Sequence, residues 1–125
     1  MAAAVTDVLT ENHIKGVPYR GPTTVFSANE TDLSTPDTSQ QYDVKGIAMV
    51  SFQVVFANYT AVTVKFQRSL DGGTTWDDIS GASISTSGDV VAFTPNAPLI
   101  RLSVGATLSG AADTLTVHLY MEGQS

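Results

Sequence analysis

The chain has 125 residues, which suits a single domain, and only 14% of them are charged, so its surface must consist largely of uncharged polar residues and Gly. Its net charge is −6 and its six Lys and Arg residues are scattered singly, which argues against direct nucleic-acid binding and against attraction to an anionic membrane. The absence of cysteine excludes disulfides, thiolate metal sites and cysteine nucleophiles.

Residues 1–43 show little sustained periodicity and are expected to form an extended N-terminal arm or long loop, with room for a short strand near residues 23–27. Pro18, Pro22 and Pro36 interrupt this region, and a polar tract follows from Asn29 to Gln41. Its first residues lack the basic and long apolar regions of a signal peptide, and no run of the chain approaches the length of a membrane span.

Residues 44–125 are expected to form a β domain, because apolar residues alternate with polar ones between turns rich in Gly, Pro and Asn. Strands are predicted at 46–57, 61–69, 75–80, 89–94, 99–105 and 114–122. Residues 81–88 are predicted to be a loop, with at most a short edge strand around Ile84.

The pattern predicts an all-β fold, an antiparallel β-sandwich with an extended N-terminal arm, and leaves open whether the strand order is jelly-roll or immunoglobulin-like. The inward positions of the alternating strands give the predicted core: Val50, Phe52, Val62, Val64, Phe66, Ile100, Leu102, Val117 and Leu119.

A hairpin is specified at Ser69–Trp76, where Ser69, Asp71, Gly73 and Trp76 have the spacing Ser-x-Asp-x-Gly-x-x-Trp. Adjacent glycines supply positive φ, the Asp71 carboxylate can accept hydrogen bonds from nearby backbone N–H groups, and Trp76 can cover the turn. This spacing resembles the Asp-box hairpin. A single copy in a short chain argues against a sialidase-type propeller, which needs several blades.

Catalytic and metal sites are not indicated by the sequence. His13 and His118 lack the Cys or Glu partners of a metal site, and we interpret them as surface or interface residues. Asp71, Asp77 and Asp78 do not have EF-hand spacing, so turn capping by Asp71 is favoured over a calcium site. We therefore expect no enzymatic activity, no metal and no cofactor.

Aromatic residues offer one further possibility, because Trp76, Tyr59 and Tyr120 could form a platform for stacking on sugars. The favoured interpretation is that Trp76 packs over its own hairpin and that both tyrosines lie at sheet edges.

The segment Phe66–Trp76 is similar to hairpins of phage head and tail proteins. With its N-terminal arm and Ser/Thr-rich sandwich, the chain resembles the capsid decoration (cement) proteins of tailed bacteriophages. The resemblance implies a non-enzymatic homotrimer that is made in the host bacterial cytoplasm, binds the major capsid protein on the virion exterior and stabilises the head. It further implies that an N-terminal arm clasps the shell, here through Val5, Val8, Leu9, Ile14, Val17 and Tyr19.

Two alternatives remain open at this stage. One is a carbohydrate- or receptor-binding module of a phage tail or secreted enzyme, which would use exposed aromatics such as Trp76 and Tyr59. The other is a tail-tube or head-completion subunit, which differs from a decoration protein only in its position in the virion.

Overall fold

The computed structural model describes residues 19–123, which form eight strands and no helix. The strands are β1 (Tyr19–Asn29), β2 (Leu33–Asp43), β3 (Ile47–Ala57), β4 (Thr60–Ser69), β5 (Asp77–Ile84), β6 (Val90–Phe93), β7 (Leu99–Thr107) and β8 (Thr114–Gly123).

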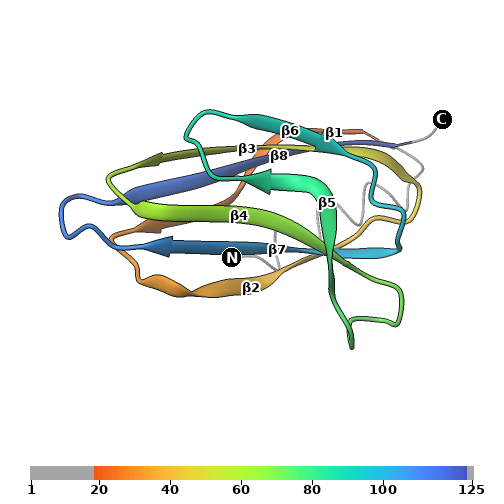
Figure 1. Cartoon of the computed structure of the whole chain (residues 1–125). Helices are drawn as coiled ribbons and strands as arrows, with labels where there is room; N and C mark the ends of the chain where they lie inside the picture. Colours follow the sequence, from red (N-terminus) through yellow and green to blue (C-terminus); the bar gives the residue numbers. More distant parts are fainter. Residues whose placement is uncertain (1–18, 124–125) are drawn as a thin grey trace.

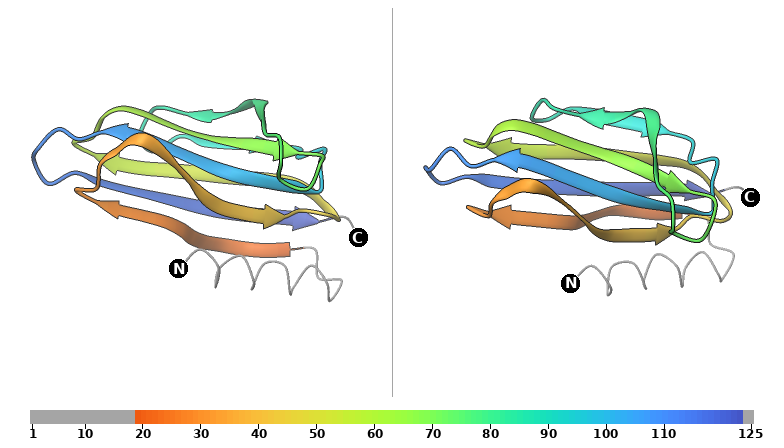
Figure 2. Two further views of the ribbon diagram at one scale, coloured as in Figure 1. Left: turned by 90° about the horizontal axis from the view of Figure 1, so that it is seen from below. Right: turned by 60° about the horizontal axis from the view of Figure 1, so that its bottom comes forward.

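These strands form two four-stranded sheets with the orders β1-β8-β3-β6 and β2-β7-β4-β5. Every paired neighbour is antiparallel. The two sheets lie face to face, as Figures 1 and 2 show, and the hairpin between β4 and β5 projects away from them in Figure 1. The predicted antiparallel β-sandwich is therefore confirmed.

The strand order decides between the two sandwiches that the sequence left open. β4 pairs with β5, β3 with β6, β2 with β7 and β1 with β8, so the pairs are nested around the middle of the chain. This is one long antiparallel ribbon that is rolled up, and the additional pairs β8–β3 and β7–β4 join its turns into two sheets. A ribbon rolled in this way is a jelly roll.

The structure differs from the predicted arm over residues 19–43, which form β1 and β2 instead of a loop; the short strand foreseen near 23–27 lies within β1. Both are edge strands, one in each sheet, and register shifts interrupt both pairings. Bulges break the alternation from which strands are recognised, and an edge position tolerates Pro36. Residues 1–18 lie outside the described part of the chain.

A second difference concerns residues 81–84, which continue β5 to Ile84 instead of starting the predicted loop. Ala82 and Ile84 are buried within the core while the residues between and after them are exposed. Residues 81–84 were not recognised as a strand because they are rich in Ser and Gly and contribute only two buried side chains.

Side chains of both sheets meet in a core that includes all nine residues predicted from alternation. At its centre the rings of Phe52 and Phe66 pack edge to face, with centroids 4.9 Å apart, and so link β3 of one sheet to β4 of the other. Phe93 lies beside both rings and Tyr42 beside Phe66. This cluster fixes how the two sheets pack, and hence which side chains remain on their outer faces.

Candidate functional site

The β4–β5 hairpin is the first feature with organised polar chemistry, and the structure brings its four predicted residues together. The Ser69 hydroxyl donates to Asp71 Oδ1 at 2.8 Å and accepts from the Gly73 amide at 2.8 Å. Asp71 Oδ1 also accepts from the amides of Thr74 and Thr75, at 3.1 and 2.9 Å. Gly72 and Gly73 have φ values of 80° and 101°, which favour glycine.

These contacts determine the charge state of Asp71. The hydrogen bond from the Thr75 amide, followed by that from the Ser69 hydroxyl, lowers the pKa of this carboxyl to about 2. The group is therefore ionised at neutral pH, with Oδ1 holding the turn, and it is poorly suited to donate a proton as a general acid.

Trp76 closes the hairpin from its other end. Its Nε1 donates to the Gly73 carbonyl oxygen at 3.0 Å, and the Arg101 guanidinium carbon lies 4.5 Å from the ring centroid. The half-buried indole is therefore packed over its own hairpin, with a cation on one face of the ring.

Arg101 continues a polar network across the outer face of the β2-β7-β4-β5 sheet, which we call the charged face. Its Nε donates to Gln67 Oε1 at 2.7 Å, and Gln67 Nε2 donates to Asp78 Oδ1 at 2.8 Å. Lys65 Nζ lies 3.1 Å from Asp78 Oδ2. The hydrogen bond from Gln67, and then that from Lys65, lowers the pKa of Asp78. Asp78 thus already has two polar partners on this face.

The outer face of the β1-β8-β3-β6 sheet has a different character, and we call it the uncharged face. Between residues 23 and 123, Glu122 at the end of β8 is the one charged side chain at its outward positions. The other outward residues of β3, β6 and β8 are Met49, Ser51, Gln53, Val55, Ala57, Val90, Ala92, Thr114, Thr116, His118 and Tyr120. This face therefore offers apolar and neutral hydrogen-bonding groups.

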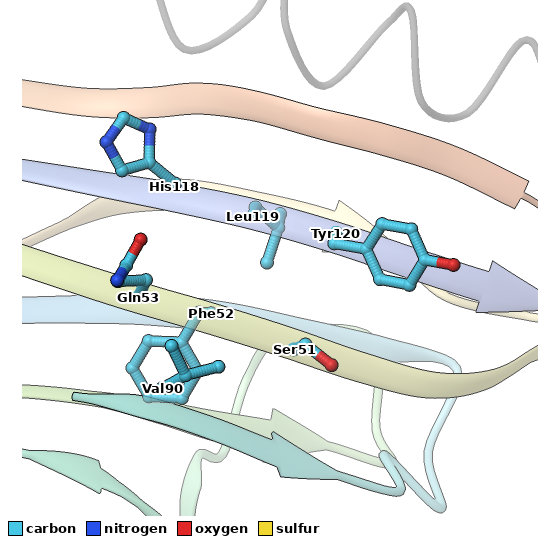
Figure 3. A pocket seen from close by; sticks show the side chains of 7 residues that line it. All are labelled: Ser51, Phe52, Gln53, Val90, His118, Leu119 and Tyr120. Carbon is cyan, nitrogen blue, oxygen red and sulfur yellow. The ribbon is translucent and has the colours of Figure 1, made fainter. Parts of the chain in front are cut away.

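A shallow depression of about 150 Å³ lies in the middle of the uncharged face, lined by Ser51, Gln53, Val90, His118 and Tyr120 above the buried side chains of Phe52 and Leu119 (Figure 3). The His118 Nδ1 is hydrogen-bonded to the Thr24 hydroxyl at 3.0 Å, and Gln53 Nε2 donates to the Gly88 carbonyl oxygen at 3.2 Å. These bonds hold both side chains across the sheet surface.

Sequence reasoning did not foresee this face, although it interpreted His118 as a surface or interface residue. Gln53 on β3 is in register with His118 on β8 on one side and with Val90 on β6 on the other. These residues are far apart in the chain, so only the strand pairing brings them together. The available signal was weak: outward apolar residues such as Val90 interrupt the polar positions of their strands.

The remaining predicted residues are placed as follows. Tyr59 is only 5% exposed, and its hydroxyl donates to the Thr31 carbonyl oxygen at 2.7 Å and accepts from the Thr31 amide at 3.0 Å. It is therefore neither an exposed aromatic nor a surface platform. Tyr120 lies on the inner strand β8, not at a sheet edge as expected.

The predicted shell-binding residues are largely outside the described part of the chain, as is His13. Of that set only Tyr19 is placed, at the start of β1, where it is in register with Glu122. Within residues 19–123, no three acidic or histidine side chains are grouped as a metal site would need. The same residues include no helix long and apolar enough to cross a membrane.

No protein-family model and no curated protein matches this sequence. A solved structure, the crystal structure of SPBc2 prophage-derived protein YomS, is similar in fold, with a TM-score of 0.52 at 12% sequence identity. The similar region covers 82% of this chain and 96% of YomS. The two proteins thus have a similar fold over most of both chains, and at this identity the likeness concerns the fold alone.

Proposed function

We propose that this chain is a structural protein of a tailed-bacteriophage virion, a decoration protein that binds the outside of the capsid as a homotrimer and stabilises the head. The observation that carries the proposal is the jelly-roll fold. Over 82% of the chain, this fold is similar to the structure of a prophage-derived protein. Viral capsid domains are among the proteins built on this fold. The resemblance of the hairpin and chain layout to decoration proteins supports the same role.

In this proposal the N-terminal segment, residues 1–18, binds the major capsid protein through Val5, Val8, Leu9, Ile14 and Val17. The segment leads into β1, an edge strand of the sandwich, so it is tethered at the border of a rigid body. Apolar side chains of this segment would add binding energy where they are buried against the capsid protein. Three tethered copies raise the effective concentration of each segment at the shell.

The proposed role is structural and non-enzymatic. Asp71 is held in the hairpin turn and Asp78 is bonded to Lys65 and Gln67, so both acids already have structural partners. Such a protein is made in the bacterial cytoplasm and resides on the capsid exterior, without a nucleic-acid, membrane or cofactor partner.

The carbohydrate-binding alternative is less well supported, because it relied on Trp76 and Tyr59 as exposed aromatics. Tyr59 is buried and one face of Trp76 packs against Arg101. A glycan titration followed by the fluorescence of Trp76, the one tryptophan of the chain, is therefore expected to stay flat.

The experiment that tests the proposal is co-sedimentation of the protein with undecorated shells of the phage that encodes it. We expect the full chain to bind, and a variant lacking residues 2–18 to remain folded by circular dichroism but to lose binding. Normal binding by that deletion variant would contradict the assigned role of the segment, and failure of the full chain to bind would contradict decoration itself.

A matched pair of substitutions separates apolar anchoring from simple charge effects. Val8→Asp with Leu9→Asp removes two anchors, whereas Thr6→Asp with Thr10→Asp adds the same charge at neighbouring polar positions. We expect the first pair to abolish shell binding and the second to weaken it only slightly. Equal losses would show that charge, not apolar contact, governs binding.

A further inference from the structure

We infer that the uncharged face of the β1-β8-β3-β6 sheet is the surface through which copies of this chain associate with one another. This inference rests on the homotrimer of the proposed function and names the interface that would build it.

The distribution of charge selects this face. Each copy carries a net charge of −6, so two copies repel one another unless their charged groups stay apart or in water. The charged face presents Lys65, Asp78 and Arg101, whose burial would require their desolvation. The uncharged face has Glu122 only at one end of β8, so burying the middle of the sheet removes no described charge from water.

Exposed apolar side chains also concentrate on the uncharged face. Met49, Val55 and Val90 are 36%, 44% and 64% exposed and all lie there. The other large exposed apolar residues described, Leu70 and Leu108, lie outside the strands. Met49 is in register with Glu122 at the end of the sheet, so the apolar pair that matters is Val55 and Val90. Apolar residues that adjoin one another on a surface and are rimmed by polar ones mark an interaction site, whereas single exposed residues do not.

Val55 and Val90 belong to the same part of this face. Val90 is in register with Gln53 on the neighbouring strand, and Val55 follows Gln53 by two residues, so both side chains flank Gln53 on the same side of the sheet. Because Val90 is on the edge strand β6, the apolar part of the face reaches the border of the sheet. A border position suits a ring of three copies, where each copy meets the next at an edge.

A second copy matches the polar groups of this face as well. Ser51 and Thr116 carry hydroxyls, and Gln53 carries an amide, so each side chain can both donate and accept hydrogen bonds. In a ring of three copies these groups meet a different patch of the neighbouring copy, and such neutral groups can bond to its polar atoms without requiring opposite charges there.

The area of the face sets an upper limit on the contact that it can make. Each residue of a sheet covers roughly 16 Å² of its plane, so the four strands, which contain 11, 10, 11 and 4 residues, offer about 550 Å² per copy. Burial of this whole face against an equal area of the neighbouring copy gives at most about 1,100 Å², which clears the roughly 1,000 Å² that a specific interface needs.

The test compares the native masses of the full chain and two matched double variants by light scattering coupled to size exclusion. Val55→Glu with Val90→Glu places two like charges on the uncharged face. Thr63→Glu with Ser83→Glu adds the same charge at exposed positions on the other sheet. We expect trimers for the wild type and for the second variant, and a monomer for the first. Circular dichroism verifies that each variant is folded.

Should the glutamate pair on the uncharged face fail to fold, Val55→Ser with Val90→Ser replaces it, with an expected loss of at least tenfold in the association constant. A trimer that survives the substitutions at Val55 and Val90 unchanged would overturn this inference while leaving the proposed homotrimer intact. A monomeric wild type would overturn both the interface and the trimer. Co-sedimentation with shells would then decide whether decoration itself stands.

Discussion

The Arg101 guanidinium lies 4.5 Å from the centre of the Trp76 ring, and this contact joins the projecting β4–β5 hairpin to β7, an inner strand of its sheet. Arg101 also donates to Gln67 on β4. The Arg101 guanidinium therefore contacts both the Trp76 ring of the hairpin and Gln67 on β4. These contacts hold the hairpin to the sheet in addition to the covalent links through β4 and β5.

Arg101→Ala is expected to lower the free energy of unfolding by about 1–2 kcal/mol, because it removes a cation–π contact and a hydrogen bond. Urea unfolding followed by the Trp76 emission measures this change, and the folded-state emission should shift to longer wavelength as the ring gains water. Lys45→Ala, which removes the same charge from the turn between β2 and β3, serves as the control and should leave the emission unchanged. An equal shift in both variants would contradict the assigned contact.

The stability conferred by Asp71 is expected to depend on acid pH. Because its pKa is about 2 in the folded protein and near 3.8 in the unfolded chain, its ionised form is favoured by folding. That stabilisation is complete above about pH 4 and is lost as the pH falls towards 2. The difference in melting temperature between wild type and Asp71→Asn should therefore be largest above pH 4 and shrink towards pH 2. A difference that stays constant over this range would count against the hydrogen-bonded carboxylate.

Phe66→Ala should be among the most damaging single substitutions, since the Phe66 ring is fully buried and contacts aromatic rings of both sheets. We expect a loss of about 3–5 kcal/mol in the free energy of unfolding, measured with urea. Phe66→Leu retains most of the apolar volume and should lose roughly 1–2 kcal/mol. Similar losses in both variants would mean that aromatic packing, not volume, dominates this position.

Ala61 has a φ of 51° at the register shift between Thr60 and Thr63, a conformation that costs a non-glycine residue about 1 kcal/mol or more. Ala61→Gly should therefore keep or slightly raise the stability of the protein. Thr63→Gly, at an exposed position of the same strand, should lower it by about 1 kcal/mol, because glycine weakens regular strands. Thermal unfolding of both variants tests the difference in sign.

The sequence predicted those parts of the fold in which one strand face is buried and the other is wet. β4 and β8 alternate cleanly, so Val64, Phe66 and Val117 were identified as core residues from pattern alone. The hairpin was equally predictable, because Ser69 and Asp71 act on backbone groups within a few residues of themselves.

The parts that were missed depend on distant pairing. β2 contains six consecutive residues without a buried side chain, Pro36 among them, and it is a strand because β7 offers it partners over a bulged register. Likewise, the uncharged face exists only because β8 lies between β1 and β3. Alternation shows which way a side chain points relative to its own strand, but not which strand lies beside it.

The nested strand order also determines when each strand can pair as the chain is synthesised. The β4–β5 hairpin can close as soon as it emerges, whereas Thr24 of β1 must wait for His118 of β8, 94 residues later. At about 5–20 residues per second, this delay is roughly 5–20 s. The first strand is thus the last to be secured, and a chain that terminates before β8 leaves the strand next to the N-terminal segment without its partner. The end of the molecule to which shell binding is assigned is therefore fixed to the sheet only after translation of β8 is complete.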